Sequence, residues 1–380
     1  MFDPFGLNHS VGLTSVAALK TWFRRKVLGQ SRPLASARAP YRPSTRERAM
    51  TQLMDILSPD DYAKRFEGSS IRDCAVIDRG LFFFISLQDW DDHKPRPFAE
   101  ELQTRLTKLE LNAEKRWITT FMDGYSGLMC SGPREAEIVC VAVDGRGKVL
   151  AKMLQGSNDE RDVPGGKGHG PCRGNIAKIK PFAGRLYGCG GGRSVFYRNG
   201  PGLWIEVGPL PPEGRGEIGF HDFDGFSESD LYAGGGQGDV WRYDGRAWHQ
   251  VAFPSNQWIE SLCCGADGHV YIGAESGSVF RGRGDQWELI HQGNLSLPFR
   301  DMVWFNDRVY ATNDYGLWEI QDGQVRPSAA PIEITNCAGN LSVADGVMLM
   351  AGPHGAALHD GGSWSRLFSI GELARQSTAR

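Results

Sequence analysis

A repeat of about 40 residues runs through positions 173 to 368 and restricts the fold more than any other feature of the chain. An apolar–aromatic pair recurs at spacings of 45, 39 and 39 residues, at Leu186-Tyr187, Leu231-Tyr232, Val270-Tyr271 and Val309-Tyr310. A second apolar–aromatic pair follows about nine residues later in each unit, and Trp204, Trp248 or Trp287 follows that pair in the first three units. Each unit has room for about four short strands, which is the period of a β-propeller blade.

Turn residues support strands within each unit. The chain has 49 glycines, and Asp-Gly pairs at residues 267–268, 322–323 and 345–346 stand between apolar runs, where hairpins favour them. Apolar residues at helical spacing are absent after residue 120, which disfavours a helical solenoid of similar period. The glycine runs at residues 190–192 and 234–236 are interpreted as tight turns, because no helix follows to complete a phosphate-binding loop.

The blade count follows from these units. Five units fill residues 173 to 368, the segment from Trp117 to Leu154 is interpreted as another blade, and the segment from Arg72 to Ile77 begins a seventh because it resembles residues 300–305. The sequence therefore predicts an all-β fold, a β-propeller of about seven four-stranded blades, with six as the alternative. Residues 98–116 leave the count open, since their leucines fit a helix as well as strands.

Four regions are expected along the chain. Residues 1–43 form a basic, partly disordered segment with one short helix, whose apolar face consists of Val16, Leu19, Phe23 and Val27. Residues 44–68 form a helical lead-in, with a capping box at residues 44–47 and a second helix start at Ser58. The propeller spans residues 69–370, and residues 371–380 form a C-terminal tail.

Charge and composition restrict the partners and the compartment. The formal net charge of −3 does not favour binding to nucleic acid or to an anionic membrane. No apolar run approaches the roughly 18 residues of a membrane span, and no signal peptide is recognisable at the N-terminus. Eight scattered cysteines without Cys-x-x-Cys spacing predict reduced thiols and no zinc site. We therefore expect a cytoplasmic monomer without a cofactor, a metal or a catalytic residue.

The predicted binding surface lies at one end of the propeller. With strands a to d in chain order, the b–c turns and the d-to-a connections of all blades share one end, and aromatic and Arg side chains on such loops are typical of protein-binding hot spots. An alternative for Trp258 and Phe299 is packing between neighbouring blades. The predicted partner-binding residues are Arg193, Gln237, Asp239, Phe253, Trp258, Glu275, Phe299, Arg300, Asp314, Tyr315 and His354.

An enzymatic alternative rests on carboxylates near the predicted innermost strands. Asp73, Asp222, Glu260 and Asp301 form the candidate set, which would suit a cation-dependent, lactonase-like or other hydrolytic site at the channel mouth. No histidine recurs with them, and solvated carboxylates are the simpler interpretation. A Cys172/His169 nucleophile in the glycine-rich stretch 163–172 is disfavoured, because such a segment does not hold catalytic geometry.

The N-terminal residues Asp3-Pro4-Phe5-Gly6-Leu7 resemble the Asp-Pro-x-Gly-Leu motif that closes the core of Rhs-family polymorphic toxins. Rhs loci carry toxin fragments beside immunity genes. The resemblance therefore implies an immunity protein that neutralises a cognate toxin, encoded next door, by covering it with the propeller loops and without catalysis, in a system linked to type VI secretion. A released toxin domain and a scaffold protein are the alternatives.

Overall fold

The computed structural model describes residues 52–378, except for residues 92, 96, 133, 134, 136, 154, 167, 168 and 211–218. These residues belong to one compact unit, Ala49–Arg380. The helix predicted around residues 16–27 and the capping box at residues 44–47 lie outside the described residues.

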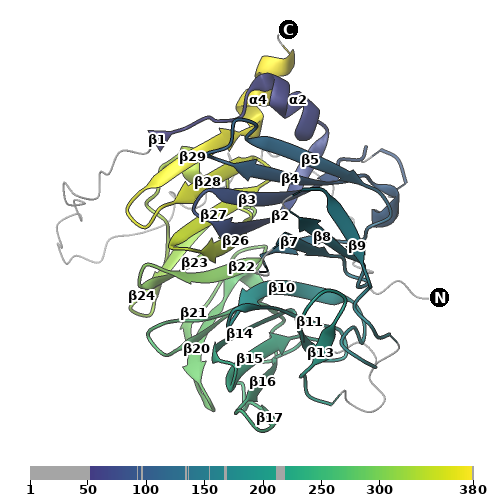
Figure 1. Ribbon diagram of the computed structural model, residues 1–380. Helices are drawn as coiled ribbons and strands as arrows, with labels where there is room; N and C mark the ends of the chain where they lie inside the picture. Colours follow the sequence, from purple (N-terminus) through teal and green to yellow (C-terminus); the bar gives the residue numbers. More distant parts are fainter. Residues whose placement is uncertain are drawn as a thin grey trace, which may run out of the picture. The chain divides into compact units, whose positions relative to one another are not determined.

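Seven antiparallel four-stranded sheets form a ring, so the fold is a seven-bladed β-propeller (Figure 1). Each blade has four consecutive strands, here called a to d from the channel outwards, and the blades are numbered 1 to 7 in chain order; the sheet of blade 7 gains one further strand. Blades 1 to 4 contain β2 (Ser69–Asp78), β3 (Leu81–Gln88), β4 (Thr104–Glu110) and β5 (Trp117–Met122); β6 (Met129–Ser131), β7 (Ile138–Val143), β8 (Val149–Met153) and β9 (Ser157–Glu160); β10 (Ile176–Phe182), β11 (Arg185–Gly190), β12 (Ser194–Arg198) and β13 (Trp204–Glu206); and β14 (Asp222–Ser227), β15 (Asp230–Gly235), β16 (Asp239–Tyr243) and β17 (Trp248–Gln250).

Blades 5 to 7 complete the ring, and short helices stand between or beside the blades. The strands are β18 (Ile259–Cys264), β19 (Val270–Ala274), β20 (Val279–Arg283) and β21 (Gln286–His291); β22 (Asp301–Phe305), β23 (Arg308–Asn313), β24 (Gly316–Gln321) and β25 (Gln324–Pro327); and β26 (Asn340–Ala344), β27 (Val347–Gly352), β28 (Gly355–His359) and β29 (Trp364–Ser369). The remaining elements are β1 (Gln52–Leu53), α2 (Pro59–Arg65), α3 (Ile332–Thr335), α4 (Ile370–Thr378), and the short 3-10 helices η1 (Ala99–Glu101) and η2 (Glu275–Gly277).

Glycine-containing turns separate the strands where the sequence predicts them. Asp322 and Gly323 have φ of 52° and 70°, and Asp345 and Gly346 have φ of 50° and 71°. A type I′ hairpin requires positive φ at both central positions, and Asp-Gly adopts it readily. The glycine run at residues 234–236 serves close packing as well, because a Cβ on Gly235 would lie 2.2 Å from the Gly219 carbonyl oxygen.

The boundary between blades 1 and 2 differs from the prediction. The strand that begins at Trp117 pairs with β4 and is the fourth strand of blade 1, whereas blade 2 begins at β6. Residues 98–116 contain η1 and β4, so the regular structure of this segment is one short 3-10 helix and one strand, and Leu106 and Leu109 are buried in β4. Contacts with neighbouring strands decide this assignment, because the spacing of the leucines suits both structures.

Four aromatic side chains close the propeller at the junction between blades 7 and 1. Phe66 follows α2, Phe84 and Trp117 belong to blade 1, and Phe368 belongs to β29. All six pairs of these rings are in contact, with centroid separations of 5.4 to 6.2 Å. The four side chains are buried in one core cluster with residues of α2 and α4. The junction is therefore sealed by packing between segments at opposite ends of the described chain.

The lead-in and the C-terminal helix add polar contacts at the same junction. Ser58 caps α2 as predicted, since its side chain accepts a hydrogen bond from the Asp61 N–H. β1 pairs in parallel with β29 as a fifth strand of blade 7. Arg366 of β29 forms ion pairs with Asp55, at 2.9 Å, and with Glu372 of α4, at 2.8 Å. Residues 370–378, expected as part of the propeller edge and a tail, are thus helical and attached to the lead-in.

We expect the aromatic junction to dominate the stability of the ring. Replacing Phe368 with Ala should lower the free energy of unfolding by about 3–5 kcal/mol, because the cavity lies among four packed rings. Urea unfolding measures this loss. The matched control is Phe121→Ala in β5, whose side chain is 52% exposed and should change stability by less than about 0.5 kcal/mol. Equal, small effects of both substitutions on the free energy of unfolding would show that the aromatic junction does not dominate stability.

Removal of residues 1–43 should leave the propeller folded, because β1, Asp55 and α2 all follow this segment. Thermal unfolding of the shortened chain should stay within about 10 °C of the full chain. A chain shortened further, to begin after Ile56, loses the Asp55–Arg366 ion pair and the Ile56 carbonyl that accepts the Trp117 indole N–H, and should unfold at a lower temperature. If removing residues 1–43 lowers the unfolding temperature as much as the longer truncation does, residues 1–43 belong to the core.

Candidate functional site

The b–c turns and the d-to-a connections meet at one end of the propeller, as predicted from the strand order. Backbone hydrogen bonds join them, including Ile176 N–H to the Gly145 carbonyl at 2.8 Å and Ile259 N–H to the Gly236 carbonyl at 2.9 Å. We call this the loop end, and we call the end that carries the a–b and c–d turns the opposite end. Each connection at the loop end is held by the neighbouring blade, so this surface is built on a rigid frame.

Large apolar side chains gather at the loop end. Ten such side chains are exposed among the described residues, and six of them lie on loop-end turns or connections: Phe98, Leu210, Trp258, Leu297, Tyr315 and Ile332. The other four are Met54, Phe121, Leu203 and Leu289, of which Leu203 belongs to a turn at the opposite end. Apolar side chains concentrated on one face of a protein are typical of an interaction surface.

The turns and connections of blades 4 to 6 form a continuous part of the loop end, which we call the blade 4–6 sector. It comprises residues 236–238, 251–258, 275–278, 292–300, 314–315 and 328–339. The Glu275 N–H donates to the Trp258 carbonyl, and the Leu295 N–H donates to the Ser276 carbonyl, both at 2.9 Å. The Tyr315 hydroxyl hydrogen-bonds to the Ser296 hydroxyl. These contacts fix the backbone beneath Trp258, Leu297 and Tyr315.

Seven of the eleven predicted partner-binding residues are exposed at the loop end: Gln237, Trp258, Glu275, Arg300, Asp314, Tyr315 and His354. Arg300 lies 3.8 Å from Asp314 in a loose ion pair. Six of the seven lie in the blade 4–6 sector and His354 lies on the b–c turn of blade 7, and their role in binding stays a prediction.

The other four predicted residues are engaged within the fold. Phe299 is fully buried and packs against Trp318 at a centroid separation of 5.2 Å, which is the alternative considered for it. Phe253 is half-buried against Phe280 and Trp287. Phe299 is therefore not exposed to a partner, whereas Phe253 is partly exposed.

Arg193 and Asp239, also predicted to bind a partner, form an ion pair between blades 3 and 4. The Arg193 Nε and Nη2 atoms donate to the two Asp239 carboxylate oxygens at 2.7 and 2.8 Å, and both side chains are largely buried. The guanidinium also lies 4.8 Å from the centre of the Trp241 ring. This bidentate geometry with a cation–π contact fastens two blades together.

Carboxylates on the innermost strands satisfy backbone groups of the next blade. Asp73 accepts a hydrogen bond from the Cys130 N–H at 2.8 Å, Asp222 from the Leu262 N–H at 2.9 Å, and Asp301 from the Leu341 N–H at 2.9 Å. The innermost strand of each blade has no further strand on its channel side. Its N–H groups on that side therefore need acceptors other than a neighbouring strand. These aspartates are therefore part of the contact between blades.

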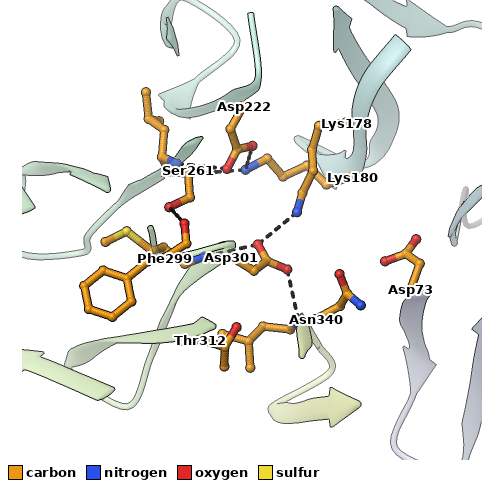
Figure 2. A network of polar contacts seen from close by, with 12 residues as sticks. Asp73, Lys178, Lys180, Asp222, Ser261, Phe299, Asp301, Thr312 and Asn340 are labelled. Carbon is orange, nitrogen blue, oxygen red and sulfur yellow. Dashed lines mark hydrogen bonds and ion pairs between the residues drawn. The ribbon is translucent and has the colours of Figure 1, made fainter. Parts of the chain in front are cut away.

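Two lysines from β10 neutralise the buried carboxylates across the channel (Figure 2). The Lys178 Nζ atom lies 2.9 Å from Asp301 Oδ1 in blade 6, and the Lys180 Nζ atom lies 2.8 Å from Asp222 Oδ1 in blade 4. Burial lowers the pKa of both lysines, but the facing carboxylates outweigh it and raise both pKa values above the usual range. The lysines thus occupy the place that a cation would take in the enzymatic alternative.

Sequence analysis missed these lysines, although a signal for them exists. Lys178 and Lys180 are two residues apart on an innermost strand, so their side chains lie on the same face of the sheet. Glu260, the fourth predicted carboxylate, lies outside the network and is 3.5 Å from His221. Among the described residues, no group of three or more His, Cys, Asp or Glu side chains could hold a metal ion.

The other catalytic candidate lacks an activated nucleophile. Cys172 is buried, and its thiol donates to the Gly174 carbonyl at 3.0 Å. Burial, and to a smaller extent Asp144, raises the pKa of Cys172, whereas a nucleophilic cysteine requires a lowered pKa. The geometry of Cys172 is that of a structural residue.

Comparisons with known proteins agree with the fold and add a relative. The sequence matches no family model. It is 31% identical over 225 residues to the immune protein Tsi7 of Pseudomonas aeruginosa, and the match covers 58% of this chain and 73% of Tsi7. In the part of the chain that the structure describes, no helix is long and apolar enough to cross a membrane.

Solved propellers are similar in structure but distant in sequence. The WD40 β-propeller domain of Doa1 is 10% identical with a TM-score of 0.52, covering 75% of this chain and 90% of that one. YCF48 bound to the D1 peptide is 12% identical with a TM-score of 0.52, covering 77% of this chain and 92% of that one. At such identities the likeness concerns the fold alone.

We expect the channel network to make stability depend on pH through Asp73. Burial raises its pKa to about 6, with the Asp301 carboxylate adding to the rise and Lys178 opposing it. The folded protein therefore binds this proton more tightly than the unfolded chain. The resulting stabilisation is complete below about pH 4 and is lost as the pH rises through about 6.

Replacing Asp73 with Asn removes this dependence while leaving an oxygen to accept the Cys130 N–H. Relative to the wild type, Asp73→Asn should be more stable near pH 7.5 than near pH 4.5, as measured by urea unfolding across that range. The control is Asp307→Asn, at an exposed turn of the opposite end. If the two variants give parallel pH profiles, Asp73 is not the group responsible.

Proposed function

Because this chain belongs to the family of the immune protein Tsi7, we propose that it is an immunity protein that binds a cognate toxin. We infer that it acts by occlusion and without catalysis, and that the loop end of the propeller covers the toxin. The concentration of exposed apolar side chains at that end carries the proposal, since six of the ten among the described residues lie there.

The rigidity of the loop end supports binding as the function. Trp258 and Tyr315 are held on hydrogen-bonded backbone, so a partner can bury these rings with little loss of conformational entropy. Aromatic side chains presented in this way supply much of the affinity in protein interfaces.

The Asp-Pro-Phe-Gly-Leu motif at residues 3–7 supports an Rhs-type toxin as the partner, with the toxin encoded beside the immunity protein. The motif lies outside the described residues, so this part of the proposal rests on the sequence. The eight unpaired cysteines support action in a reducing compartment such as the cytoplasm.

The contacts of Asp222 and Asp301 count against the hydrolase alternative for two of its four carboxylates. Asp222 and Asp301 are engaged by lysines and by backbone N–H groups of the next blade, so their carboxylates are not directed at a substrate.

The proposal is tested with the toxin domain encoded beside this chain. Purified together, the two should form a stable complex, and co-expression should restore growth to cells that the toxin alone arrests. Rescue without a complex would point to an enzymatic or indirect mechanism instead.

The exposed aromatic residues should carry affinity without carrying stability. Trp258→Ala and Tyr315→Ala should each weaken toxin binding by about 1–3 kcal/mol, because each removes a ring that the partner buries. Isothermal titration measures the affinity, and thermal unfolding checks that the fold is retained.

A control at the opposite end separates the two faces of the ring. Leu203 is 49% exposed, close to the 50% of Tyr315, and Leu203→Ala should leave the affinity within about twofold of the wild type. Phe299→Ala should instead lower stability, since Phe299 is buried. Weaker binding by the Leu203 variant together with wild-type binding by both aromatic variants would place the toxin at the opposite end.

A further inference from the structure

The blade 4–6 sector is acidic as well as apolar. Its charged residues, all of them described, are Glu275, Asp314 and Glu333 against a single cation, Arg300. All four are exposed, and Arg300 makes only a loose ion pair with Asp314 at 3.8 Å. The sector therefore carries excess negative charge next to Trp258.

Two polar atoms beneath the sector are unsatisfied in the free chain. Gln257 Oε1 and Asn313 Nδ2 are buried and have no hydrogen-bond partner among the described residues. Gln257 precedes Trp258, and Asn313 Oδ1 accepts the Tyr315 N–H at 2.9 Å, so both groups adjoin the exposed aromatic rings. Buried polar groups left unpaired cost stability, so a partner that supplies their hydrogen bonds would recover this cost.

We propose that the blade 4–6 sector receives a basic patch of the toxin that also contains apolar side chains. Lys or Arg side chains of the toxin face the carboxylates of Glu275, Asp314 and Glu333, while its apolar side chains cover Trp258, Leu297 and Tyr315. This inference rests on the proposed function and specifies the chemistry of the partner and the part of the loop end that it contacts.

Charge complementarity favours this partner over others. A second copy of the chain, related by a twofold axis, would bring the same carboxylates against one another. Nucleic acid and anionic membranes would be repelled by the sector for the same reason. A basic protein surface is attracted at long range, so the association rate constant should fall as salt screens the field.

The test compares two triple variants of the full chain that carry the same change in charge. Glu275→Gln/Asp314→Asn/Glu333→Gln removes the carboxylates of the sector. Glu114→Gln/Asp307→Asn/Asp322→Asn removes three exposed carboxylates from turns of the opposite end. Each variant changes the formal net charge from −3 to zero, so a difference between them reports the position of the charge.

Association and dissociation with the adjacent toxin domain are followed by stopped-flow fluorescence or surface plasmon resonance, from low salt to about 0.5 M NaCl. At low salt the sector variant should associate roughly tenfold more slowly than the wild type, and its dependence on salt should be flatter. The opposite-end variant should stay within about twofold of the wild type at every salt concentration.

The outcomes separate this inference from the proposed function. If the wild-type chain binds the toxin but both triple variants associate equally fast, the acidic sector does not contact it, and the inference fails while the immunity function stands. If the opposite-end variant alone is slowed, the toxin approaches that end. If the wild-type chain does not bind the toxin at all, the proposed function fails, and this inference fails with it.

Discussion

Buried carboxylates on the innermost strands join neighbouring blades around the channel, at the junctions between blades 1 and 2, 4 and 5, and 6 and 7. Asp222 and Asp301 each accept an N–H of the next blade and an ammonium group from β10. Without the lysines, these buried carboxylates would be expensive to keep ionised, and without the carboxylates, the innermost strands would present unpaired N–H groups to the channel. The two ion pairs form only when blades 3, 4 and 6 are in place, which couples the formation of these blades.

The ring of blades is closed by aromatic packing and not by the channel carboxylates. Blades 7 and 1 meet through the mutual packing of Phe66, Phe84, Trp117 and Phe368, and the Arg366 ion pairs attach the lead-in and α4 to the same junction. Packing of this kind demands shape complementarity but no particular loop sequence. The closure of the ring therefore does not depend on the sequence of the loops at its end.

Placement of the b–c turns and the connections at one end could be predicted because it follows from strand order alone. Trp258, Tyr315 and Arg300 lie at the loop end since b–c turns and connections must share an end in any propeller with consecutive strands. Burial could not be predicted in the same way. Phe299 occupies the interface with Trp318, and Arg193 is paired with Asp239 of the next blade, because the partner of each residue comes from a different strand that the local pattern does not identify.

The sequence by itself determined the repeat, the strands within each blade and the propeller they build, because apolar alternation and Asp-Gly turns act over a few residues. Tertiary structure alone decided where the repeat begins in blades 1 and 2, how the ring closes and which charges meet in the channel. Lys178 and Asp301 are 123 residues apart, and Arg366 and Asp55 are 311 apart. Such pairs exist only once the ring has brought distant strands together, so no local pattern in the chain records them.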